Sequence, residues 1–317
     1  MTTIGIDLGG TSIKAALVDR EDGILHKFSF QTDAHRGVDH IIGRLSDAIL
    51  QAAARSVEPV SGVGVGSPGV ISLDRTTVSD PPNFPGWTRV NLAAELRERT
   101  GYDVFVDNDA NLMALGSLYF GTGKGFENFI MVTLGTGVGG GIIHQNRLFR
   151  GASGGAGELG HVIIDYDGPR SLSPAQGGIE AYLGQRFLSQ RAWELIRADK
   201  DNPLYEQFKT DPVSLEPRHL TDAANQGNAL AIAILQDAGH KLGIAIVNYV
   251  HTLDIRTIIV SGGVANAGDW ILKPAKTMAL SRLIQAYHAD FDILPEILGN
   301  DAALLGSASL PYEYLSD

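Results

Sequence analysis

Short apolar runs separated by glycine-rich turns open the chain. Because each run is flanked by turn residues, we predict an antiparallel meander of three strands, Ile4–Leu8, Ile13–Val18 and Ile24–Phe30. Apolar residues at helical spacing then predict a helix over His40–Ala54. Val63–Gly66 follows as a short buried strand that ends in a Pro/Gly loop.

A similar pattern restarts near the middle of the chain. Phe129–Leu134 predicts a strand, Gly135–Gly141 a glycine loop, and Ile142-Ile143 the start of a return strand. The string LGGT at Leu8–Thr11 resembles LGTG at Leu134–Gly137 in sequence and in its strand–turn–strand context. This indicates an internal repeat of two similar domains.

The remaining apolar patterns complete an alternation of helices and strands. Spacing and turn signals predict helices at Leu92–Arg99, Ala110–Tyr119, Ala223–Val250 and Trp270–Ala286, strands at Val104–Val106 and Thr257–Val260, and a closing apolar segment at Ala302–Ala308.

Length and composition favour a two-domain globular protein. The chain has 317 residues, and domains typically run to ~100–200 residues. Its net charge of -11 and the lack of a Lys/Arg block argue against a nucleic-acid partner. The absence of cysteine excludes disulfides, thiolate nucleophiles and cysteine-ligated zinc.

Hydropathy predicts neither a membrane span nor a signal peptide. No apolar run reaches the ~18 residues of a span, and the richest stretch, Leu242–Val250, carries Asn248. The first residues contain no basic segment followed by a long apolar one. We therefore expect a cytoplasmic protein without a membrane partner.

Three glycine clusters follow apolar strands and are candidate phosphate loops. They are Asp7–Thr11, Leu134–Gly141 and Ser261–Gly263. Successive backbone N–H groups at such turns form concavities that bind anions. The alternative is that the glycines only make tight turns, but the first cluster also has an acid, Asp7, and a lysine, Lys14, nearby.

Two strings match the dinucleotide pattern G-x-G-x-x-G, at Gly64–Gly69 and Gly135–Gly140. That pattern requires a helix directly after the glycines. Here Val70–Asp74 and Ile142–Asn146 follow, and both predict strand and turn. A dinucleotide site is therefore not favoured.

Acidic residues at strand ends suit phosphoryl transfer, which needs positioned phosphates, a divalent cation and a group that accepts a proton. Asp7 can hold Mg²⁺ directly or through water, or can cap its turn. Asp107-Asn108-Asp109 follows a strand and opens a helix, so these residues are helix caps or functional groups. In the functional interpretation Asp109 is a general base and Asn108 binds a sugar hydroxyl.

A third polar group consists of Glu158, His161 and Glu180. Its first two members lie in a glycine-rich stretch, and Glu180 begins a predicted helix. Spacing alone does not decide between a solvated loop and a ligand site.

With these motifs the sequence resembles the ROK family (repressors, open reading frames and kinases) over Ile4 to about Ala308. The resemblance rests on DxGGTxxK at Asp7–Lys14, NFPGW at Asn83–Trp87, NDAN at Asn108–Asn111, LGTGVGGGI at Leu134–Ile142 with Gly160-His161, and SGGV at Ser261–Val264. It implies an α/β, two-domain actin/hexokinase/Hsp70-like ATPase fold of duplicated ribonuclease-H-like domains. We expect a smaller lobe of residues 1–117 plus 301–317 and a larger lobe of 118–300.

The resemblance also implies roles. ATP phosphates would lie at Asp7, Gly9, Gly10, Thr11 and Lys14 and at Thr136 and Gly137, Mg²⁺ at Asp7, and adenosine at Gly262 and Gly263. The sugar would contact Asn83, Asn108, Glu158, His161 and Glu180, with Asp109 as catalytic base. Closure of the two lobes over the sugar would exclude water.

One departure from the family concerns zinc. Many members carry a CxCGxxGCxE motif after the Gly-His pair, and here Ser171, Ser173 and Gly178 replace its cysteines. Since serine hydroxyls are poor zinc ligands, we expect no zinc. The loop that presents Glu180 must then be ordered by packing.

Glucose phosphorylation to glucose 6-phosphate is the activity that the resemblance favours. N-acetylmannosamine, N-acetylglucosamine, fructose and allose remain alternative substrates. A sugar-sensing repressor, a non-catalytic sugar-binding or regulatory protein and a chaperone-like ATPase are alternatives of other classes. Repressors of the family carry an added N-terminal helix-turn-helix, for which no room is expected because the first phosphate loop begins at Asp7. A homodimer is expected because dimers are common in the family.

Overall fold

The computed structural model describes residues 1–172 and 176–315. The chain divides into two compact units. Unit 1 consists of Met1–Asn128, Gly141–Gly157 and Ile297–Asp317, and unit 2 consists of Phe129–Gly140 and Glu158–Glu296. The lobe boundaries expected from the sequence, 1–117 with 301–317 and 118–300, remain a prediction.

Two sheets have the same strand order, which agrees with the predicted repeat. The first is ordered β3 (Gly23–Gln31), β2 (Ser12–Asp19), β1 (Thr2–Leu8), β4 (Val60–Ser67) and β8 (Val104–Asn108). The second is ordered β11 (Arg147–Leu148), β10 (Val138–His144), β9 (Phe129–Leu134), β12 (Thr257–Ser261) and β13 (Asp292–Pro295). A small sheet contains β5 (Val70–Ile71), β6 (Val78–Ser79) and β7 (Arg89–Val90).

The predicted antiparallel meander is confirmed in unit 1. β1 pairs antiparallel with β2, and β2 with β3, whereas β4 and β8 continue the sheet in parallel with β1. Successive residues of a strand face opposite sides of the sheet. Accordingly Ala15 and Leu17 belong to one buried cluster, and Ala16 and Val18 belong to another.

Helices cover both faces of this sheet. α1 (Val38–Ala53) and α2 (Leu92–Thr100) pack against one face, and α10 (Ala302–Ser309) packs against the other, beside α3 (Asp109–Phe120). α11 (Tyr312–Leu315) is the last helix that the described residues form.

Close packing of α10 explains the first glycine string. A Cβ atom on Gly64 would lie 1.8 Å from the carbonyl oxygen of Ser307 in α10. A side chain is therefore excluded by the helix that lies on the sheet. The residues that follow this string form β5, and the residues that follow the second string belong to β10. As expected, neither string leads directly into a helix.

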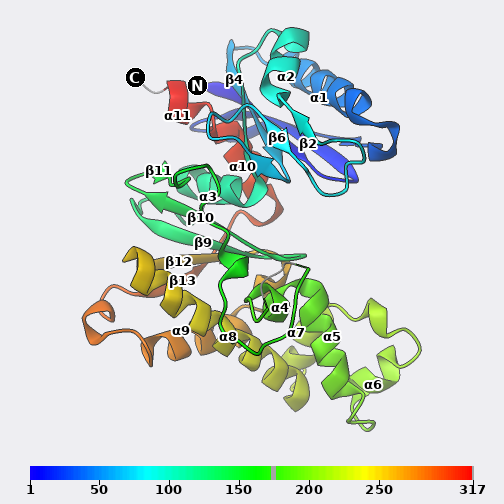
Figure 1. Ribbon diagram of the computed structural model, residues 1–317, viewed down its shortest axis with the longest axis vertical. Helices are drawn as coiled ribbons and strands as arrows, with labels where there is room; N and C mark the ends of the chain where they lie inside the picture. The colour runs from blue at the N-terminus through cyan, green and yellow to red at the C-terminus, as the bar shows by residue number, and fades with distance from the viewer. Residues whose placement is uncertain (173–175, 316–317) are drawn as a thin grey trace. The chain divides into compact units, whose positions relative to one another are not determined.

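In unit 2, α7 (Pro217–Asn225) and α9 (Asp269–Leu280) pack against the long α8 (Ala229–Leu253) (Figure 1). The same unit holds α4 (Glu180–Leu183), α5 (Gln185–Ile196) and α6 (Pro203–Phe208). Within the described residues, α8 is the one helix that length and composition would allow to cross a membrane, and 56% of its most apolar window is buried.

Two helix predictions are wrong in this unit. The single helix expected over Ala223–Val250 is interrupted, because Gly227 adopts a φ of 85° and the Asn228 side chain caps α8 by accepting a hydrogen bond from the Ala231 N–H. The helix expected over Trp270–Ala286 ends at Leu280 and is followed by a 3-10 turn at Gln285–Tyr287.

Candidate functional site

In unit 1 the candidate residues gather at one edge of the sheet. Parallel pairing aligns Asp7 with Gly66 and Gly66 with Asp107, so Asp7 and Asp107 lie level with each other on strands two apart. At the usual strand spacing this separation is about 10 Å. The carboxyl ends of β1, β4 and β8 therefore bring the first glycine turn and Asn108-Asp109 to a common edge, where ligands bind in open α/β sheets.

The first glycine turn is a compact structure with an ion pair at its base. Gly9 donates its N–H to the Ser12 carbonyl at 3.1 Å, and the Thr32 hydroxyl donates to the Gly9 carbonyl at 2.6 Å. Lys14 Nζ lies 3.1 Å from Asp7 Oδ2 across the β1–β2 pair. Gly10 and Thr11 are exposed at the tip. The turn therefore presents backbone groups, an acid and a cation together.

Asn83 lies beside this turn. A Cβ atom on Gly10 would be 3.4 Å from the Asn83 Cβ. The neighbouring Phe84 and Trp87 are buried and pack edge to face with ring centroids 5.8 Å apart. These two aromatic side chains anchor the loop that presents Asn83.

The three polar residues Asp107, Asn108 and Asp109, where β8 passes into α3, have separate structural roles. Asp107 is fully buried, Asn108 is half-buried, and Asp109 is exposed as the first residue of α3. The Asn108 side chain caps α3 by accepting a hydrogen bond from the Ala110 N–H at 2.9 Å. The capping interpretation is thus confirmed for Asn108. The Asp109 carboxylate accepts a hydrogen bond from the same Ala110 N–H, at 2.8 Å.

Unit 2 aligns the other two glycine loops in the same way. β9 and β12 are parallel, with Thr133 opposite Ser261, so Thr136 and Gly137 after one strand and Gly262 and Gly263 after the other lie at one edge. On its other side the Thr136 turn contacts the start of α5, where the Gln185 N–H donates to the Gly135 carbonyl at 2.9 Å.

Glu180, a member of the third polar group, contacts this glycine loop. Its Oε2 accepts a hydrogen bond from the Val138 N–H at 3.2 Å, and a Cβ atom on Gly137 would lie 2.3 Å from the same oxygen. Backbone pairing of Ile163 with Gly178, and of Ile179 with Val162, brings the segment after His161 next to the start of α4. His161 Nε2 lies 3.3 Å from Glu158 Oε2.

Hydrogen bonds connect the described residues of the segment between His161 and Glu180. The Tyr182 hydroxyl donates to Asp165 Oδ2 at 3.1 Å, and burial and this bond raise the pKa of Tyr182 to about 12. Gly177 donates to the Pro169 carbonyl and accepts from the Ile164 N–H. Ser171 and Gly178 are described, whereas Ser173 lies outside the described residues.

No group of three or more His, Asp or Glu side chains is placed to hold a metal among residues 1–172 and 176–315. The chain also contains no cysteine. The absence of zinc remains a prediction. A single carboxylate such as Asp7 fits Mg²⁺, because this ion usually keeps several waters and the oxygens of substrate phosphates as its other ligands.

Sequence reasoning missed a cavity that adjoins Thr136. It has a volume of about 740 Å³ and is lined largely by one face of α5 and by the segment before α7, including Gln185, Ser189, Trp193 and Leu215. The Ser189 hydroxyl is buried without a hydrogen-bond partner among the described residues. The amphipathic pattern of α5 resembles that of an ordinary core helix, so the sequence offers no signal for a cavity.

Comparison with known proteins agrees with this organisation. The chain matches the ROK family over residues 3–313. The glucokinase of Thermotoga maritima is 33% identical over 307 residues, covering 97% of this chain and 96% of that protein. The xylose repressor of Bacillus subtilis is 27% identical, covering 99% of this chain and 78% of the repressor.

A solved structure is similar along the full length. The ROK family glucokinase from Streptomyces griseus, crystallised in complex with glucose and AMPPNP, is 33% identical with a TM-score of 0.82, and the match covers 99% of this chain and 100% of that one. The predicted fold is therefore confirmed. This chain belongs to the ROK family and is a sugar kinase with the actin-like ATPase fold.

Proposed function

We propose that this sugar kinase transfers the γ-phosphoryl group of ATP to glucose, giving glucose 6-phosphate and ADP, with Asp109 as general base. The observation that carries the proposal is the alignment of Asp7 and Asn108-Asp109 at one sheet edge. The similarity to glucokinases supports glucose as acceptor.

In the proposed reaction the Asp109 carboxylate accepts the proton of the sugar hydroxyl while the oxygen of that hydroxyl attacks the γ-phosphorus. The bond between that phosphorus and the β,γ-bridging oxygen breaks, and ADP leaves. Asn83, Asn108, Glu158, His161 and Glu180 would orient the sugar. Because Asp109 is exposed and begins a helix, its carboxylate is accessible to a bound hydroxyl.

The phosphates would lie against Gly9, Gly10, Thr11 and Lys14 in unit 1 and against Thr136 and Gly137 in unit 2. Asp7 would hold Mg²⁺, which neutralises phosphate charge when bound. The adenosine would lie beside Gly262 and Gly263, and the cavity next to Thr136 offers room for part of the nucleoside. A cytoplasmic location and a homodimer also remain proposals.

The first test is ADP release from Mg·ATP with a panel of hexoses and N-acetylhexosamines, with and without a zinc-selective chelator. We expect turnover with glucose that the chelator does not change. A preference for N-acetylmannosamine, N-acetylglucosamine, fructose or allose would reassign the substrate. Sugar binding without turnover on any sugar would favour a non-catalytic sugar-binding protein.

The Gly137→Ala variant tests the sugar role of Glu180. The new Cβ would displace the Glu180 carboxylate from the Val138 N–H. Loss of an oriented charged ligand costs about 1–3 kcal/mol, so we expect the KM for glucose to rise about 5- to 150-fold. Gly155→Ala is the control, because a Cβ there meets nothing within 4 Å. An unchanged KM for glucose in Gly137→Ala would remove Glu180 from the sugar site.

A further inference from the structure

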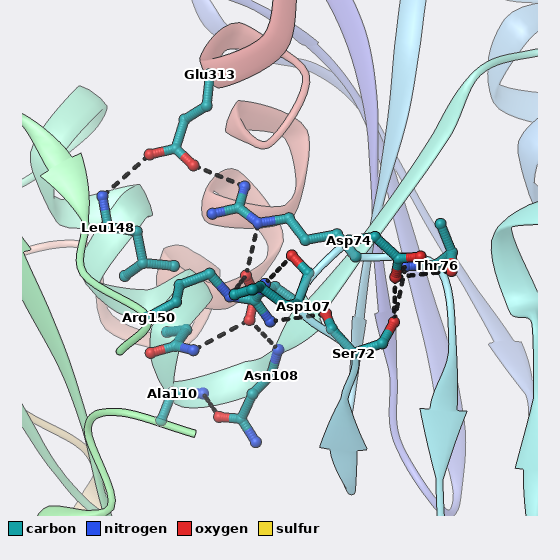
Figure 2. Close-up of polar contacts among 12 residues, drawn as sticks. Ser72, Asp74, Thr76, Asp107, Asn108, Ala110, Leu148, Arg150 and Glu313 are labelled. Carbon is teal, nitrogen blue, oxygen red and sulfur yellow. Dashed lines mark hydrogen bonds and ion pairs between the residues drawn. The ribbon is translucent and has the colours of Figure 1, made fainter. Parts of the chain in front are cut away.

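A cluster of four charged side chains is buried next to the end of β8 in unit 1 (Figure 2). Arg75, Asp107 and Arg150 are 4%, 0% and 7% exposed, and the side chain of Glu313 is 11% exposed. Arg75 lies in the turn after β5, and Asp107 lies near the end of β8. Arg150 lies shortly after β11, and Glu313 lies in α11. Two guanidinium groups face two carboxylates, so the four formal charges cancel.

Two arginines share one oxygen of Asp107. Arg75 Nε and Arg150 Nε each lie 3.1 Å from Asp107 Oδ2, and Arg75 Nη1 lies 2.6 Å from Glu313 Oε2. These contacts are within ion-pair distance but lack the alignment of hydrogen bonds. Charge therefore holds the carboxylate between the guanidinium groups. Burial acts to lower the pKa of Arg75, but the charges of Glu313 and Asp107 outweigh it and raise that pKa.

The other oxygen of Asp107 faces the candidate catalytic turn. Asp107 Oδ1 accepts hydrogen bonds from the Asn108 N–H at 2.8 Å and from the Asn111 side-chain amide at 3.0 Å. Asn108 in turn caps α3 through the Ala110 N–H (Figure 2). A rotation of the Asp107 carboxylate would therefore break the hydrogen bond that fixes the backbone at Asn108, the residue before Asp109.

Separate chain segments hold the cluster itself. Arg150 donates from Nη1 to the Leu73 carbonyl at 2.8 Å and from Nη2 to the Ser72 carbonyl at 3.2 Å. Glu313 Oε1 accepts from the Leu148 N–H at 3.1 Å (Figure 2). The guanidinium of Arg150 is thus fixed on both sides, by Asp107 and by the loop after β5.

We propose that Arg75 and Arg150 are positioning residues that hold the Asp107 carboxylate in the orientation that aims Asn108 and Asp109 at the acceptor sugar. This inference rests on the roles proposed above for Asn108 and Asp109. Stability alone is a weak reason for such a cluster, because well-packed apolar groups often replace a buried ion pair without loss of folding free energy. The link from two guanidinium groups through Asp107 to Asn108 supplies a functional reason.

Kinetics of Arg150→Met and Arg150→Lys test the proposal, with the exposed Arg147→Met as control. A misplacement of about 1 Å can cost about 100-fold in rate, so we expect kcat of Arg150→Met to fall about 10- to 100-fold. The KM for glucose should rise, because Asn108 moves too, while the KM for ATP stays unchanged. Arg150→Lys should recover part of the loss. A merely structural role would reduce the active fraction, which lowers apparent kcat without changing either KM.

A double-mutant cycle shows whether Arg150 acts through Asp109. In the Asp109→Asn background, Arg150→Met should lower kcat no further. Amide hydrogen exchange at Asn108 and Ala110 should be faster in Arg150→Met than in the wild type. If Arg150→Met does not fold, Glu313→Gln perturbs Arg75 from the other end of the cluster and should give the same kinetic pattern with smaller changes.

A wild-type kcat together with wild-type amide protection in Arg150→Met would overturn the positioning role. So would a double mutant whose loss of kcat equals the product of the losses in the two single mutants. A wild type without turnover on any hexose, or a fully active Asp109→Asn variant, would instead refute the proposed function. In either of those cases amide exchange at Asn108 and Ala110 still decides whether the arginines orient the turn.

Discussion

Replacing Asp109 with asparagine is expected to lower kcat for glucose phosphorylation by about 100- to 10,000-fold, the usual contribution of a general base. Asparagine has the same shape but does not accept the hydroxyl proton at neutral pH. The fold should persist, because Asn108 rather than Asp109 provides the side-chain cap at the position before α3. Glucose binding should therefore remain measurable by calorimetry.

Asp103→Asn is the matched control for this experiment. Asp103 lies directly before β8, and its side chain is 54% exposed. Asp103 Oδ1 lies 3.3 Å from Arg97 Nη1. Such surface pairs are worth about 0–1 kcal/mol, so kcat should stay at the wild-type value. Should Asp109→Asn retain the full rate, another group accepts the proton, and the catalytic assignment fails although the enzyme remains a sugar kinase.

Gly64→Ala is expected to destabilise unit 1 by about 3 kcal/mol, the upper part of the usual range for overpacking a core. The added Cβ would lie 1.8 Å from the Ser307 carbonyl oxygen and 3.0 Å from the Leu310 Cβ. The first of these atoms belongs to the backbone of α10, so a side-chain rotation cannot relieve the clash. The helix itself must move away from β1 and β4.

Urea denaturation of Gly64→Ala and Gly43→Ala measures this effect. Gly43 lies inside α1, and a Cβ there meets nothing within 4 Å. Alanine in a helix interior is more favourable than glycine by about 0.5–1 kcal/mol, so the control should be slightly more stable than the wild type. Equal stability of Gly64→Ala and the wild type would show that α10 does not rest on Gly64 in solution.

Local patterns predicted most elements of the fold. Strands such as β1, β4 and β8 were expected because apolar runs and turn residues are adjacent in sequence. The break between α7 and α8 was missed because Gly227 and Asn228 lie inside an otherwise continuous helical pattern. The end of α9 at Leu280 was missed too, since the residues after it remain apolar enough to continue the pattern.

The sequence by itself determined the motifs, because strand–glycine turns such as Asp7–Thr11 and the capped helix start at Asn108-Asp109 are local structures. The tertiary structure alone decided which distant groups meet. Glu180 reaches the Val138 N–H, and Asp107 is held by arginines from separate segments. Such contacts depend on how strands pair and helices pack, and a charged residue carries no local pattern that reveals its distant partner.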